Sequence, residues 1–191
     1  MRTLIPELAD GLAPHLDLPF AFFGHSLGAL LAYELAQHLR RTGGPVPGTL
    51  FLSSAAAPQL PRRRVAHLPD QEFIGEIRAY GGARGWDEPG VAETFMPVLR
   101  ADFELYESYQ VASEPPPGCP VLLYGGDQDE RVTPAQLGAW RRLLPVQSLQ
   151  LFPGGHFYLH DQRAALTASV ARSLDALTPA PEAVELLGGA R

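Results

Sequence analysis

The chain has 191 residues, 46% of them hydrophobic and 19% charged, which is the composition of one folded domain with a substantial core. A formal net charge of −6 disfavours nucleic acid as a partner, and no apolar stretch reaches the roughly 18 residues of a membrane span. One cysteine, Cys119, excludes an internal disulfide, so a cytoplasmic location is expected.

The first part of the chain alternates between helical and strand-like patterns. Residues 3–17 carry leucines at helical spacing, and the continuous apolar run 18–23 is typical of a strand buried on both faces. Residues 27–41 are predicted to form an amphipathic helix, and residues 49–54 a second short strand. We therefore interpret residues 1–54 as part of an α/β core.

A different pattern begins at residue 55. Residues 55–115 are interrupted by prolines and glycines, with helical patterns at 70–79 and 91–109, which predicts an irregular, mostly helical insertion.

Core-like elements then return in residues 116–178. Strands are expected at 120–126 and 147–152, and helices at 133–144 and 161–177. Residues 179–191 are expected to be a flexible tail. The alternation of strands and helices predicts an α/β fold with a mostly parallel sheet and right-handed crossovers.

The sequence GHSLG at residues 24–28 fits the pattern G-x-S-x-G, in which a serine occupies a sharp strand-to-helix turn. Such a turn is crowded, so the glycines two residues before and after the serine are expected to make room for the backbone. The helix that follows directs backbone N–H groups towards a developing negative charge. Ser26 is therefore predicted to be a nucleophile, the alternative being a glycine-rich turn with only a structural role.

A serine nucleophile needs a base and an acid that orients the base. Candidate acids follow the strand 120–126 in the sequence YGGDQDERV. Asp129, in the local pattern G-x-x-D, is the predicted acid and Asp127 is the alternative. Glu130, the remaining carboxylate, is expected to belong to a solvent-exposed acidic turn.

The predicted base is His156, because a Gly-Gly loop after the last strand can bring its imidazole over the edge of the sheet. His160, one helical turn later, is the alternative. His25 is expected to serve in packing, since adjacent residues on a tight turn point apart. The chain order Ser26, Asp129, His156 is that of α/β-hydrolases. No histidine or cysteine spacing fits a metal site, and no cofactor is expected.

With this triad in place, the sequence resembles the type II thioesterases that accompany polyketide and nonribosomal peptide synthetases. The matching stretches include PFAFFGHSLGALLAYELAQHLR, FMPVLRADFELYESYQ, CPVLLYGGDQDERVTPAQLGAWRRL and LQLFPGGHFYLH, and they extend over about residues 18–166. The resemblance implies an α/β-hydrolase fold and removal of stalled acyl groups from the phosphopantetheine arm of carrier proteins. It also identifies residues 55–115 as a lid over the substrate chamber.

Family members carry several strands before the serine turn, with a His-Ala-Gly-Gly type loop that supplies a second oxyanion donor. Here one helix precedes the strand that leads into that turn, so the backbone N–H of Leu27 is the one identifiable donor. We expect a truncated chain that lacks the N-terminal strands. A complete chain would be a monomer, whereas the truncated one could dimerise through its exposed sheet edge.

Other interpretations stay open. A general serine esterase would use the same triad, and a malonyl-type acyltransferase shares the GHSxG turn. A catalytically impaired, carrier-binding fragment would fit the absent oxyanion loop. The sequence PRRR places Arg62, Arg63 and Arg64 where they could contact an acidic carrier protein or form a solvated basic patch.

Overall fold

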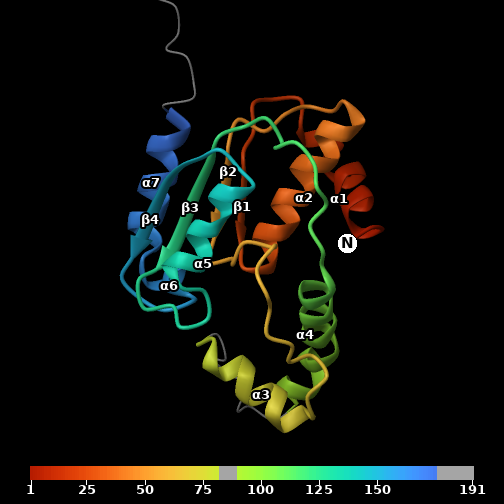
Figure 1. Ribbon diagram of the computed structural model, residues 1–191, viewed down its shortest axis with the longest axis vertical. Helices are drawn as coiled ribbons and strands as arrows, with labels where there is room; N and C mark the ends of the chain where they lie inside the picture. The colour runs from red at the N-terminus through yellow and green to blue at the C-terminus, as the bar shows by residue number, and fades with distance from the viewer. Residues whose placement is uncertain (82–89, 176–191) are drawn as a thin grey trace, which may run out of the picture.

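The computed structural model describes residues 1–81 and 90–175. Within them the core is a parallel sheet of four strands in the order β1-β2-β3-β4 (Figure 1). The strands are β1 (Phe22–His25), β2 (Leu50–Ser53), β3 (Val121–Gly126) and β4 (Val146–Phe152). Because all four run in the same direction, their C-terminal ends meet at one edge of the sheet.

Helices cover both faces of this sheet (Figure 1). One face packs against α2 (Leu27–Thr42), α5 (Pro134–Gly138) and the 3-10 turn η2 (Ala139–Arg142), in the largest hydrophobic cluster of the described residues. The other face packs against α6 (Tyr158–Asp161) and α7 (Arg163–Asp175).

The N-terminal helix forms an outer layer. Helix α1 (Leu4–Leu12), extended by the 3-10 turn η1 (Ala13–His15), lies against α2 through a separate cluster around Ile5 and Leu35.

Strand β2 shows why the apolar run of a central strand is continuous and does not alternate between apolar and polar residues. Leu50 and Leu52 point to the α2 side of the sheet, whereas Phe51 points to the α7 side. All three are at most 1% exposed, as expected for a parallel strand with both faces covered.

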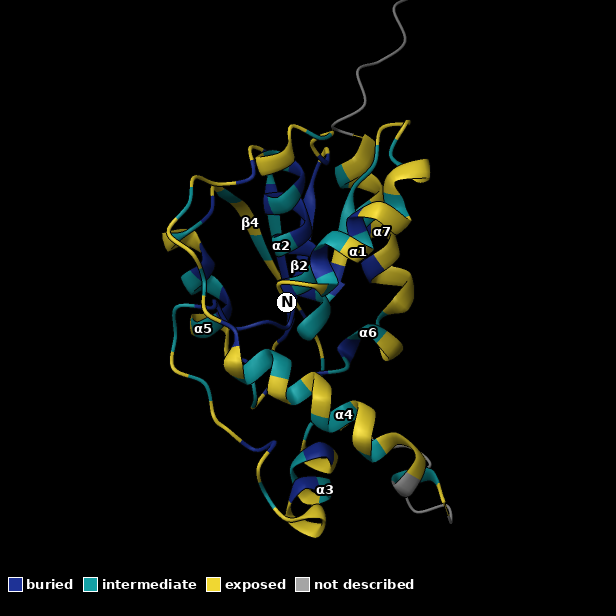
Figure 2. Cartoon of the chain, turned by 90° about the vertical axis from the view of Figure 1, so that its right-hand side faces the viewer, coloured by how far each residue is buried: buried dark blue, intermediate teal, exposed yellow. Residues whose placement is uncertain are grey.

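The connection from β2 to β3 carries α3 (Asp70–Ala79) and α4 (Val91–Ser108). These helices lie beyond the C-terminal edge of the sheet and are much more exposed than the central strands β2 and β3 (Figures 1 and 2). They share a small hydrophobic cluster of their own, built around Phe73 and Ile77. Among the residues described, none of the helices is long and apolar enough to cross a membrane.

Two predicted elements need correction. The first strand begins at Phe22, not at residue 18, because Pro19 has no N–H for a ladder and Leu18 is 71% exposed. The helix expected over 133–144 is α5 followed by the tighter η2. In this tighter turn, Nε1 of Trp140 lies 2.8 Å from the carbonyl oxygen of Ala55, to which its N–H donates a hydrogen bond.

Candidate active site

Ser26 lies at the turn between β1 and α2, at the C-terminal edge of the sheet. Its backbone adopts φ 54° and ψ −120°, a conformation that costs a residue with a Cβ atom about 1–3 kcal/mol. The turn is held because the N–H of Ser26 donates to the carbonyl of Ser53, 2.8 Å away on the neighbouring strand. The turn has the geometry expected of a nucleophile presented by a sheet edge.

The two glycines around Ser26 are not equivalent. A Cβ atom on Gly24 would stand 2.1 Å from the carbonyl oxygen of Gly28, so no side chain fits there. A Cβ atom on Gly28 would meet nothing within 4 Å. The expected crowding is therefore confirmed at Gly24 and is wrong at Gly28, since Gly28 contributes its backbone and not the absence of a side chain.

Leu27 is the first residue of α2. The backbone N–H groups in the first turn of a helix have no acceptor within the helix, and the helix dipole makes this end favourable for negative charge. Leu27 also lines the cavity that contains Ser26, so the first turn of α2 borders that cavity.

Asp129 and His156 form a buried pair. Nδ1 of His156 lies 2.8 Å from Oδ2 of Asp129, and both residues are 4% exposed. The other carboxylate oxygen, Oδ1, accepts the backbone N–H groups of Arg131 and Val132, each at 2.9 Å. These bonds fix the carboxylate with one oxygen facing the imidazole.

The surroundings of Asp129 keep it ionised. Burial alone would raise the pKa of its carboxyl group, but the hydrogen bond and charge interaction with His156 and the two backbone N–H donors outweigh burial. The net effect is a pKa below the ordinary aspartate value. Asp129 can therefore orient the imidazole as a carboxylate at neutral pH.

A close approach between two loops brings this pair together. A Cβ atom on Gly126, at the end of β3, would stand 2.3 Å from the carbonyl oxygens of Gly154 and Gly155. The missing side chain at Gly126 thus lets the histidine loop pack against the strand that leads to Asp129. The sequence YGG signals this position, although its role could be assigned only once the loop was placed.

Aromatic rings surround the imidazole of His156. The ring centroids of His25, Tyr80 and Phe157 lie 5.1, 5.0 and 5.1 Å from that of His156. Tyr80 follows α3, and burial raises the pKa of its hydroxyl to about 12, so the ring stays neutral. The insertion therefore contacts the histidine directly, which the sequence did not predict.

Arg131 joins the insertion to the acid loop. Its guanidinium donates to Glu76 of α3 at 3.0 Å and lies 4.9 Å from the centroid of the Tyr80 ring. Because the backbone N–H of Arg131 also binds Asp129, one residue contacts both the acid and the helix above it.

A cavity of about 390 Å³ opens over Ser26 and His156. Its far wall comes from α3 and α4 and is largely apolar. Its apolar and aromatic residues are Ile77, Tyr80, Leu99, Phe103 and Tyr106, and Asp102 of α4 also lines it. The cavity can therefore hold a hydrocarbon chain next to a serine nucleophile.

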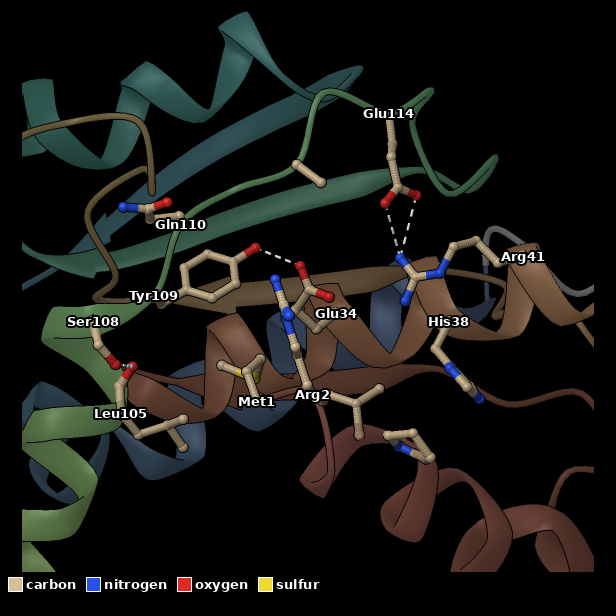
Figure 3. A pocket seen from close by; sticks show the side chains of 13 residues that line it. Met1, Arg2, Glu34, His38, Arg41, Leu105, Ser108, Tyr109, Gln110 and Glu114 are labelled. Atoms are coloured by element: carbon tan, nitrogen blue, oxygen red, sulfur yellow. Dashed lines mark hydrogen bonds and ion pairs between the residues drawn. The ribbon is translucent and has the colours of Figure 1, made fainter.

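A second hollow, of about 520 Å³, lies between the start of α1, helix α2 and the segment after α4 (Figure 3). Several of its polar groups are paired: Tyr109 donates to Glu34, and Glu114 binds Arg40 and Arg41 at 2.8 and 3.0 Å. It contains neither Ser26 nor His156, so it is separate from the candidate active site.

The alternative acid and base lie outside the buried pair. Asp127 is exposed and accepts the backbone N–H of Gly154 at 3.0 Å. His160 is also exposed and stacks on Phe157. Within the described ranges, no group of three His, Cys, Asp or Glu residues could hold a metal ion.

His25 makes a second serine–histidine contact, through Nδ1 to Oγ of Ser53 at 2.9 Å. Ser53 is fully buried and bound to the hydroxyl of Tyr158 at 2.8 Å, and this contact includes no carboxylate. Burial and the nearby His156 lower the pKa of His25 to about 3, so it is neutral at physiological pH. This chain of hydrogen bonds is structural, as expected for His25.

Two arginines of the PRRR sequence make contacts within the protein. The guanidinium of Arg62 donates to the carbonyl of Tyr109 and lies over the rings of Tyr106 and Tyr109. Arg63 pairs with Glu76.

The comparison with protein families decides the class. The model of the thioesterase domain matches residues 1–177. The chain belongs to the thioesterase family. Its relatives include the protein named linear gramicidin dehydrogenase LgrE of Brevibacillus parabrevis, 38% identical over 91% of this chain and 69% of the relative. That name mentions a dehydrogenase, but this sequence holds no G-x-G-x-x-G dinucleotide-binding motif.

Solved structures agree with this family. The RedJ thioesterase of the prodiginine pathway of Streptomyces coelicolor matches with a TM-score of 0.83 and 38% identity, over 90% of this chain and 70% of RedJ. YbtT, a type II thioesterase of the yersiniabactin pathway, matches with a TM-score of 0.82 and 32% identity, over 92% and 74%. The parallel sheet is thus that of α/β-hydrolase thioesterases, and the resemblance to type II thioesterases of these pathways is confirmed.

Proposed function

We propose that this thioesterase hydrolyses acyl thioesters from the phosphopantetheine arm of carrier proteins, and so clears stalled or misprimed polyketide and nonribosomal peptide synthetases. The observation that carries the proposal is that His156, whose Nδ1 lies 2.8 Å from the buried carboxylate of Asp129, lines the same cavity as the strained Ser26. The kinship with type II thioesterases of such pathways supports the substrate class.

The chemistry is a two-step acyl transfer through a Ser-His-Asp triad. Asp129 accepts the Nδ1–H of His156, which leaves Nε2 free to take the proton of Ser26. The serine oxygen attacks the thioester carbonyl, and the carrier thiol leaves with the proton from Nε2. In the second step a water molecule gives a proton to Nε2 and adds to the acyl carbon, after which Ser26 leaves with that proton.

The oxyanion is stabilised by the N–H of Leu27 at the positive end of α2. Removing one oxyanion donor typically lowers kcat about 10²- to 10³-fold. Thiolates leave more readily than alkoxides, so a thioester is more reactive at this site than the corresponding alkyl ester.

Residues 55–115 act as the lid of the substrate chamber, between core segments 1–54 and 116–178. The apolar residues that α3 and α4 contribute to the cavity wall support this role, as does the contact of Tyr80 with His156. The tail expected at 179–191 lies outside the described residues. An acyl chain would lie against the lid while the pantetheine thioester reaches Ser26.

The test compares wild type with Ser26→Ala on an octanoyl-loaded acyl carrier protein. Loss of hydrolysis in the variant supports the proposal, and full activity in the variant would contradict it. The general-esterase alternative predicts faster turnover of p-nitrophenyl octanoate than of the carrier thioester. The alternative of an impaired carrier-binding fragment predicts carrier binding without hydrolysis by wild type.

A further inference from the structure

Ser54, the residue after β2, is the second non-glycine residue with positive φ in the described part of the chain. Its φ is 43°, a region that favours glycine. Its side chain is also unusual: the residue is 1% exposed, and its Oγ has no hydrogen-bond partner among the described residues. Both features destabilise the fold, and such costs concentrate at functional sites.

The position of Ser54 suggests what its hydroxyl does. It lines the same cavity as Ser26, Leu27 and His156. The N–H of Ser26 donates to the carbonyl of Ser53, so Ser54 directly follows the residue that pairs with the nucleophile across the β1–β2 ladder.

Ser54 also lies on a particular side of the nucleophile. Strand β2 separates β1 from β3 and β4, whose loops carry Asp129 and His156. Ser54 is therefore on the side of Ser26 from which the base acts. A group exchanging protons with His156 must occupy this side of the cavity.

We infer that Ser54 is a catalytic residue of deacylation: its Oγ, which is buried beside the cavity in this structure, turns about χ1 into the cavity and accepts a hydrogen bond from the water that hydrolyses the acyl-enzyme. The inference rests on the proposed function. The water molecule donates one O–H to Nε2 of His156 and the other to Oγ of Ser54. A lone pair of the water oxygen then faces the acyl carbon. The C–O bond to water forms, the proton passes to His156 and then to the departing Oγ of Ser26, and the carboxylic acid is released.

A purely structural role would not select serine here. Glycine would relieve the positive φ, and alanine would remove the unpaired hydroxyl. Both Ser54→Gly and Ser54→Ala are therefore expected to unfold at the same or a higher temperature than wild type. A loss of function in these variants could not be attributed to misfolding.

The experiment uses octanoyl-N-acetylcysteamine as the acyl donor in buffer containing methanol, and measures the ratio of octanoic acid to methyl octanoate. Methanol has a single O–H, which it gives to His156, so it has none for Ser54. We expect the ratio to fall about tenfold in both Ser54 variants, the effect of losing one hydrogen bond between neutral groups. An unchanged ratio in both variants would overturn the inference.

Ser53→Ala is the matched control. Ser53 is equally buried, but its hydroxyl binds His25 and Tyr158 and it does not line the cavity. We expect a lower unfolding temperature with an unchanged product ratio. An equal fall in the ratio would assign the effect to a loosened strand end and would contradict the role of Ser54. Intact mass spectrometry separates the two proposals: without an octanoyl group on Ser26 of wild type, the proposed function itself fails.

Discussion

The orientation of His156 by Asp129 gives the sharpest quantitative expectation for this enzyme. In Asp129→Asn, the side chain carries one oxygen and one NH2 group in the place of two oxygens. The two backbone N–H groups of Arg131 and Val132, each at 2.9 Å from Oδ1, require the oxygen at that position. The NH2 group must then face Nδ1 of His156, which lies 2.8 Å from Oδ2 in the native protein.

This amide orientation forces the wrong imidazole tautomer. Two donors cannot face each other, so Nδ1 must present a lone pair and Nε2 must carry the proton. The histidine can then no longer take the proton of Ser26. In a serine protease with the same change, kcat falls by a factor of about 10⁴, which corresponds to about 5 kcal/mol. We expect a loss of this order here, with an unfolding temperature close to that of wild type because the backbone hydrogen bonds remain.

The assay is hydrolysis of octanoyl carrier protein, followed by release of the carrier thiol, with circular dichroism to verify folding. Asp127→Asn is the matched control, because Asp127 is exposed and its amide oxygen can still accept the Gly154 N–H. Its activity should stay within about twofold of wild type, the range expected for a surface change. If Asp127→Asn were inactive and Asp129→Asn active, the assignment of the acid would be refuted.

Three further predictions concern the turn around Ser26, the side chain of His25 and the helix α3. Gly24→Ala should lower stability by several kcal/mol, since its Cβ would stand 2.1 Å from the carbonyl oxygen of Gly28, whereas Gly28→Ala should be nearly neutral; urea denaturation distinguishes them. The pKa of His25 is lowered to about 3 from a value near 6.5 when unfolded, so its contribution to stability is present above pH 6.5 and is lost as pH falls towards 3. Between pH 6.5 and 5, the free energy of unfolding of wild type should therefore fall by about 1.4 kcal/mol per pH unit more than that of His25→Asn. Equal dependence of the two free energies on pH would contradict the lowered pKa of His25. Arg131→Met removes the ion pair with Glu76 at 3.0 Å while keeping the backbone N–H, so amide hydrogen exchange in α3 should become faster; unchanged protection would show that other contacts hold α3 in place.

The sequence predicted the elements whose periodicity is strong. Residues 70–79 are helical with the expected limits, because Pro69 precedes the helix and its apolar face packs on α4. The first strand begins four residues later than predicted, because the apolar run 18–23 includes Pro19, which has no N–H to donate to a neighbouring strand.

The same contrast applies to the candidate site. Ser26, Asp129 and His156 follow strand ends in the chain, and parallel topology brings such ends together, so the pair of His156 with Asp129 could be anticipated. The ring contact of Tyr80 with His156 depends on a side chain from the insertion, and the positive φ of Ser54 is a backbone angle. Neither has a local sequence pattern, so they are seen only in the folded structure.

The central claim is that Ser26 carries the acyl group. It is tested most directly by rapid quenching of octanoyl carrier protein with the enzyme, followed by peptide mapping with mass spectrometry. We predict an octanoyl adduct on the peptide that contains Ser26, and none in Ser26→Ala. An adduct on another residue, or steady hydrolysis by Ser26→Ala, would contradict the account.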